Sequence, residues 1–124
     1  MSHKTEQQPD FVQWEIDLLG DIDPVVRLRS AVELGRRQAA EAAPALVERL
    51  GLERELFIRE TLTWAVLRIA GDAMPYLHQA LSSPRWLARM QAMHVLARWA
   101  ATKLPIGWFR WSVTRWTGPD SGQL

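Results

Sequence analysis

The chain of 124 residues contains no cysteine. Disulfide bonds, thiolate metal sites and cysteine nucleophiles are therefore excluded, and a cytoplasmic location is expected. Long apolar runs are missing as well, since none approaches the ~20 residues that a helix needs to cross a bilayer. The first ten residues, Met1–Asp10, are polar and have no apolar centre. They predict a flexible polar leader over residues 1–8 and no secretory signal.

The patterns of known catalytic and metal sites are also absent. The histidines His3, His78 and His94 have no acidic residue beside them. The sequence has neither a glycine-rich phosphate loop nor the spacing of a serine–histidine–aspartate site. We therefore predict a non-enzymatic protein that needs no cofactor and no metal ion.

Acidic residues are unevenly distributed although the net charge is only +1. Residues 1–24 carry six acidic side chains and one lysine, whereas residues 73–119 carry six basic side chains and no acid. Such asymmetry is typical of a surface that binds an anionic partner. The alternative is that a small helical protein has scattered charges and the division has no function.

Two short patterns recur along the chain with a period of about thirty residues. Pro44, Pro75 and Pro105 are spaced by 31 and 30 residues, and Leu46 and Leu50 recur as Leu77 and Leu81. The second pattern is an apolar residue followed by arginine, with another apolar residue seven positions after the arginine: Val26-Arg27 with Leu34, Ile58-Arg59 with Val66, and Ala88-Arg89 with Leu96. This period predicts stacked helix pairs, each too small to bury its apolar face alone.

Helical spacing and capping residues predict the bounds of three such pairs. No stretch alternates with period two, so we expect no strand. The repeat domain should span residues 9–102. Its predicted helices are Pro9–Leu19, Pro24–Arg37, Glu41–Leu50, Arg54–Ala70 as the longest, Asp72–Leu81 with Asp72 as the cap, and Arg85–Thr102 after a capped-proline start at Ser83-Pro84.

The phrase from Asp21 to Gly35, Asp-x-Asp-Pro-x-Val-Arg-x-x-x-Ala-x-x-Leu-Gly, resembles the HEAT-like repeats of the phycobilin-lyase type. The resemblance covers about residues 11–101 and implies a right-handed α-solenoid of three helix pairs plus a C-terminal half repeat. Such repeats occur in scaffolds, in bilin lyase subunits, in deoxyhypusine hydroxylases and in DNA glycosylases. The hydroxylases hold iron with His-Glu pairs, and this chain has no such dipeptide.

The resemblance also implies a role for the arginine of each phrase. In such repeats it bridges to an acidic residue in a neighbouring loop. Arg27, Arg59 and Arg89 are therefore predicted to be structural, with partners among Asp21, Asp23, Glu53 and Glu55. The third loop, Ser82-Ser83, has no acid, so Arg89 is expected to be unpaired or to reach back to Glu53 or Glu55.

One further face of the second helix in each pair is defined by its position relative to Arg27, Arg59 or Arg89, which we call the phrase arginines. It contains the residues two, five and nine positions after the phrase arginine. At 100° per residue these positions lie within about 60° of each other. The resemblance makes this face a concave stripe that could bind a partner. Its candidate residues are Arg29, Arg36, Thr61, Trp64, Arg68, Gln91, His94 and Arg98.

Arg36, Arg68 and Arg98 occupy the same position in all three repeats of the stripe. Stacking would place them about 10 Å apart as a column of positive charge. The alternative interpretation is structural, because a basic residue in the last turn of a helix stabilises the macrodipole by about 0.3–1 kcal/mol. Trp64 has a similar alternative, which is packing on a neighbouring helix.

The C-terminal residues 103–124 differ in composition from the repeats. Pro105 continues the proline series, and Trp108, Phe109 and Trp111 follow it beside basic residues. A helix here would either cap the repeats or contact a protein partner, a membrane surface or nucleic-acid bases. Self-association through this end and continuation into a longer array are the remaining alternatives.

These patterns together favour a protein-interaction module that binds another protein on its concave face. The first alternative is a module that binds nucleic acid or another polyanion, although a pI near 8.3 is low for a strong binder. The second alternative is a partner-dependent subunit of a lyase-like enzyme. The identity of the partner is not encoded in any of these patterns.

Overall fold

The structure is a computed structural model that describes residues 10–103. This part of the chain is helical and contains no strand, so the all-α prediction is confirmed. Its α-helices are α2 (Phe11–Leu18), α3 (Pro24–Arg37), α4 (Ala43–Leu50), α5 (Leu56–Arg68), α6 (Ala70–Ala80) and α7 (Trp86–Thr102), and the short 3₁₀ helix η1 (Ala40–Ala42) precedes α4. The leader predicted over residues 1–8 and the contact patch of Trp108, Phe109 and Trp111 lie outside the described residues.

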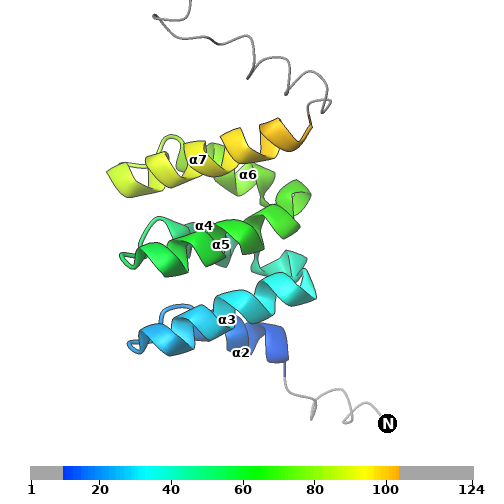
Figure 1. Ribbon diagram of the computed structural model, residues 1–124, viewed down its shortest axis with the longest axis vertical. Coiled ribbons are helices and arrows are strands. Elements are labelled where there is room, and N and C mark those ends of the chain that lie inside the picture. The colour runs from blue at the N-terminus through cyan, green and yellow to red at the C-terminus, as the bar shows by residue number, and fades with distance from the viewer. Residues whose placement is uncertain (1–9, 104–124) are drawn as a thin grey trace, which may run out of the picture.

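The helices form three pairs, α2 with α3, α4 with α5 and α6 with α7, stacked in chain order (Figure 1). Helices α3, α5 and α7 form a front layer, and α2, α4 and α6 form a back layer (Figure 1). The three front helices begin at the same edge of the stack. We call this the loop edge, and it contains the connections 19–23, 51–55 and 81–85.

Aspartates set the start of the first two helices. The Asp10 carboxylate accepts a hydrogen bond from the Gln13 amide at 3.1 Å and caps α2. Asp23 accepts from the Val25 amide at 2.9 Å and caps α3, with Pro24 at the first helical position. A proline costs little there because its missing N–H would have no partner within the helix. The predicted Asp-Pro start of this helix is confirmed.

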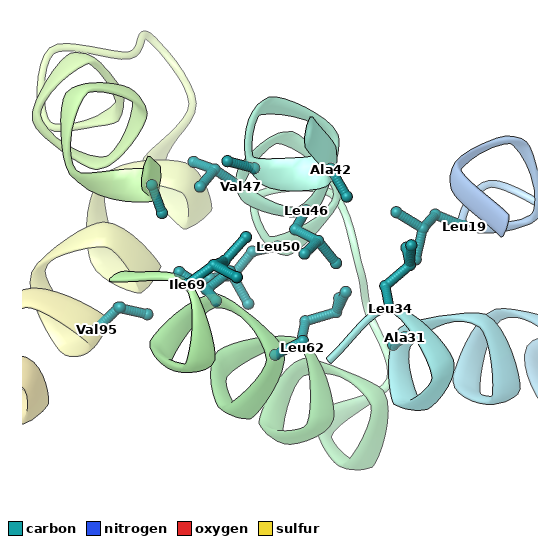
Figure 2. Close-up of a cluster of buried hydrophobic side chains, with 14 of the residues drawn as sticks. Leu19, Ala31, Leu34, Ala42, Leu46, Val47, Leu50, Leu62, Ile69 and Val95 are labelled. Carbon is teal, nitrogen blue, oxygen red and sulfur yellow. The ribbon is translucent and has the colours of Figure 1, made fainter. Parts of the chain in front are cut away.

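Leucines at repeating positions fill the space between the layers. Leu46 and Leu77 are fully buried at equivalent positions of α4 and α6, and Leu62 is fully buried in α5. Figure 2 shows Leu34, Leu46, Leu50 and Leu62 in one continuous cluster with Ile69 and Val95. Leu81 is an exception to the register because 38% of its surface is exposed, whereas its counterpart Leu50 is 1% exposed.

The junction between the second and third pairs differs from the prediction. Helix α5 ends at Arg68 and α6 begins at Ala70, so Gly71 and Asp72 lie in the first turn of α6 and no side chain caps it. The chain breaks at Ile69 because this turn buries Ile69, Ala70 and Ala73 in the core. The predicted end at Ala70 and the predicted Asp72 cap are wrong.

The last helix also corrects the sequence prediction. Helix α7 has 17 residues and α5 has 13, so the second helix of the middle pair is not the longest. Helix α7 begins at Trp86, and Pro84 lies ahead of it in the connection. Ser83 still acts at this start, since its hydroxyl accepts from the Arg85 amide at 3.1 Å.

Candidate functional site

The predicted stripe lies on the front layer, on α3, α5 and α7. Six of its residues are exposed, and Thr61 and Gln91 are half-buried. The exposed ones are Arg29, Arg36, Trp64, Arg68, His94 and Arg98. The structure brings Trp64 and Arg68 together, with the Arg68 guanidinium 5.6 Å from the centre of the Trp64 ring. Arg29 instead lines a hollow at the first pair, between α2 and α3.

Each arginine of the predicted column has a partner within the protein. Arg36 pairs with Glu33 at 2.7 Å, one turn earlier on α3. Arg98 of α7 lies 3.6 Å from the carboxylate of Glu60 on α5. Arg68 Nε donates to the carbonyl oxygen of Gly35 at 2.8 Å and so ties the end of α5 to the end of α3. These contacts supply a structural reason for all three arginines, and their role in binding a partner stays a prediction.

The hydrogen bond from Arg36 is the largest influence on Glu33 and lowers the pKa of its carboxyl group. Partial burial acts in the opposite direction, and a second hydrogen bond from Arg37, at 2.7 Å, adds to the lowering. Glu33 therefore stays ionised at neutral pH. The positive charge at the end of α3 is partly neutralised by this carboxylate, which reduces its attraction for an external anion.

Trp64 packs against Gly35 of α3. A Cβ atom added to Gly35 would lie 2.8 Å from Trp64 Cε3 and closer still to Cζ3, so the indole ring occupies the space that the missing side chain leaves. Even so, 40% of the surface of Trp64 remains exposed. The residue therefore joins α3 to α5 and also presents one side of its ring to solvent.

We expect Gly35→Ala to destabilise the protein by about 1–3 kcal/mol, because the new methyl group must displace the indole ring. Urea unfolding monitored by circular dichroism measures the change. Gly71→Ala is the matched control, since nothing lies within 4 Å of its added Cβ and alanine favours the helix over glycine by about 0.5–1 kcal/mol. Equal effects of the two substitutions would contradict the packing described for Trp64.

Sequence reasoning missed two apolar residues that extend the stripe towards the loop edge. Val25 and Phe57 lie two residues before the phrase arginines and are 58% and 70% exposed. Phe57, Thr61 and Trp64 follow the spacing of one helical face on α5. A hollow of about 380 Å³ beside them is lined by Val32, Glu60, Thr61 and Trp64. The signal was an apolar residue two positions before the arginine in every repeat, where a solvent-exposed first turn would be polar.

The phrase arginines form a regular series along the loop edge. In each repeat the arginine Nη1 donates to the backbone carbonyl six residues earlier, at 2.9, 3.0 and 2.8 Å for Arg27, Arg59 and Arg89. Only Arg27 also binds a carboxylate, that of Glu53, within the described residues. The predicted pairing with an acid is thus confirmed for Arg27 alone, and Arg89 binds the Ser83 carbonyl rather than Glu53 or Glu55.

Residues 10–103 contain no group of three or more histidine or acidic side chains that could hold a metal ion. None of the helices in this range is long and apolar enough to cross a membrane. No family model matches the chain, and neither a curated protein nor a solved structure matches it. The geometry of the front layer and of the loop edge is therefore the basis for a functional proposal.

Proposed function

We propose that this protein is a non-enzymatic interaction module, a right-handed α-solenoid of HEAT-like helix pairs that binds a protein partner on the exposed face of α3, α5 and α7. The observation that carries the proposal is the pair of aromatic side chains on α5, Phe57 at 70% and Trp64 at 40% exposure. Large exposed aromatic residues cost solvation free energy in an isolated protein, and they are enriched among the residues that dominate binding at protein interfaces.

The surroundings of these aromatic residues support a protein partner. Val32 of α3 lines the same hollow as Trp64 and extends the apolar area onto α3, where Val25 is also exposed. Charged residues lie on the same helices, in the ion pair Arg36–Glu33 on α3 and in the ion pair Arg98–Glu60 between α7 and α5. An apolar centre with charged residues around it is the usual composition of a protein interface.

The test replaces Phe57 with alanine. Because Phe57 is mostly exposed, the substitution should leave the free energy of unfolding nearly unchanged. Removal of a central aromatic side chain should weaken the affinity for a partner recovered with the full chain by about 30-fold, measured by titration calorimetry. Tyr76→Ala is the matched control, since Tyr76 is 38% exposed on α6 of the back layer. A partner that binds Phe57→Ala as tightly as the wild type would exclude this face.

Binding of nucleic acid or another polyanion is the second candidate. It is supported by the absence of acidic residues between positions 73 and 103, where Arg85, Arg89, Arg98 and Lys103 lie. If this candidate holds, affinity falls steeply with salt concentration. Arg36→Ala or Arg98→Ala should then reduce the slope of log affinity against log salt concentration by about one for each phosphate that the arginine neutralises. A salt-independent complex that requires Phe57 supports the protein partner instead.

A further inference from the structure

Each front helix has one face that the next pair of the stack covers. On α3 this face contains Ala31 and Gly35, which are buried, and Gly35 packs against α5. On α5 the position equivalent to Ala31 is Thr63, which is fully buried. Glu60 lies one turn before Thr63 on the same side of α5 and pairs with Arg98 of α7. This side of a front helix is therefore directed towards the pair that follows.

The third pair has the same face, but no pair follows it in the described part of the chain (Figure 1). Met93 of α7 lies four residues after the phrase arginine, at the position of Ala31 and Thr63. Met93 is 53% exposed, whereas Ala31 and Thr63 are 0% exposed. Met90 and Ala97 lie one turn before and one turn after Met93, and both are exposed. We call Met90, Met93 and Ala97 the tail face, an apolar face at the position that a following pair would cover.

A hollow at the first pair corresponds to half of a groove inside the stack. The groove has a volume of about 540 Å³ and lies between the second and third pairs. The residues that the third pair contributes to its lining include Tyr76, Ala80, Ser83 and Ala88. The residues 62 positions earlier, which is two repeat periods, are Trp14, Leu18, Asp21 and Val26. All four of these line the hollow of about 320 Å³ between α2 and α3. The first pair thus has the wall that contacts a preceding pair, and we call Trp14, Leu18 and Val26 the head face.

The opposite wall of such a groove is present at the other end of the stack. Inside the stack this wall comes from α4 and includes Pro44 and Val47. The residues 31 positions later are Pro75 and His78 of α6, and both are exposed. The third pair therefore has the residues that would complete the hollow of the first pair, but the two lie at opposite ends of the stack (Figure 1).

The charges of the two ends are opposite. Residues 10–26 carry five acidic side chains and no basic one, whereas residues 73–103 carry four basic side chains and no acid. Two different ends therefore attract each other and two identical ends repel each other. Glu33 of the first pair already pairs with Arg36 and Arg37, so a contact at this end does not leave its charge without a partner. A second copy of the chain matches both the repeat register and the charge of each end.

We infer that copies of this chain bind head to tail, with the tail face of one copy packed against the head face of the next. The contact repeats the packing of successive pairs within the stack. It joins two different surfaces, so it leaves a free head face and a free tail face and extends into longer assemblies or closes a ring. The inference does not rest on the proposed function, because Phe57 and Trp64 belong to the middle pair and lie at neither end.

Sedimentation velocity of the full-length protein tests the association. The mean sedimentation coefficient should rise with protein concentration from the micromolar to the millimolar range and pass the value of a dimer. Added sodium chloride should weaken the association, since it screens the attraction between opposite charges. A two-fold contact between identical ends would stop at the dimer and would become stronger with salt, and either result would overturn the inference.

Substitutions at the two ends locate the contact. Met93→Glu and Trp14→Glu each place a carboxylate in the apolar contact, and each should weaken the association by about tenfold or more. Both residues are more than half exposed, so the monomer should keep its circular dichroism spectrum. Leu56→Glu is the matched control, because Leu56 is 63% exposed on α5 of the middle pair. It should associate as the wild type does.

A mixture of the two end variants tests the head-to-tail arrangement directly. Trp14→Glu keeps its tail face and Met93→Glu keeps its head face, so the two together can form one contact. An equimolar mixture should therefore form a dimer and no larger species, although each variant alone stays monomeric at the same concentration. The inference is overturned if the wild type stays monomeric at every concentration or if the mixture does not associate. It is also overturned if Leu56→Glu weakens the association as much as the end variants do.

Discussion

Glu53→Gln is expected to destabilise the protein by about 3–5 kcal/mol, the range for removing one partner of a buried ion pair. Glutamine keeps the shape of the side chain but leaves the Arg27 and Arg49 guanidinium groups without their counter-charge, and its amide group cannot accept a hydrogen bond where the second oxygen did. Because Arg27 and Arg49 retain 13% and 21% exposure, we expect the lower end of this range. Urea unfolding at pH 7 provides the measurement.

Glu33→Gln is the matched control for this substitution. Glu33 also pairs with two arginines, but the pairs are exposed on the surface of α3. Exposed ion pairs contribute little because water screens them and because two long side chains lose freedom. No measurable change is expected for the control, and an equally small change for Glu53→Gln would show that the buried carboxylate does not hold the first two repeats together.

The stability contributed by Glu53 should depend on pH in a defined direction. Burial alone would raise the pKa of its carboxyl group, but the hydrogen bonds from Arg27 and the Glu55 amide and the charge of Arg49 outweigh burial and lower the pKa below 4.5. The unfolded chain therefore takes up this proton at a higher pH than the folded protein does. The stabilisation is complete above the unfolded pKa and is lost as the pH falls through the folded value. The difference in unfolding free energy between wild type and Glu53→Gln should accordingly shrink below pH 4.5, and a constant difference would contradict the lowered pKa.

The repeat register predicted the core well, because burial follows from the helical period alone. Leu34, Ile58 and Val66 belong to the pattern that recurs around the arginines, and all three are buried. The break at Ile69 could not be predicted, since Gly71 and Asp72 carry stronger local signals for a helix end and a cap than Ile69 does. Burial of Ile69, Ala70 and Ala73 against neighbouring helices decided the outcome, and those neighbours are distant in sequence.

The contacts of the stripe residues could not be predicted from the sequence. The period placed Trp64, Arg68 and Arg98 on one face of the second helices of the pairs, and all three are exposed on α5 and α7. It could not show that Arg98 meets Glu60 of another helix or that Arg68 binds a backbone carbonyl, because these contacts depend on how closely the helices approach. Phe57 was missed because the stripe was defined only from positions after the arginine.

The last prediction compares two leucines that the repeat makes equivalent. Leu50→Ala should cost about 2–5 kcal/mol, since Leu50 is 1% exposed within the central cluster and the cavity left by truncation cannot fully collapse (Figure 2). Leu81→Ala should cost less than about 1 kcal/mol, because Leu81 is 38% exposed and loses little buried surface. Both values come from thermal and urea unfolding followed by circular dichroism.

The two substitutions together test where the repeat pattern stops determining burial. Leu50 ends α4, with α6 and α7 of the third pair following it in the stack, whereas Leu81 follows α6 in the last described pair. A leucine at this position of the repeat is thus expected to contribute to stability where a following pair covers it. This behaviour is expected when each repeat is stabilised by its neighbours. A small effect of Leu50→Ala would contradict the packing of the second pair. A cost for Leu81→Ala as large as that for Leu50→Ala would contradict the exposure of Leu81.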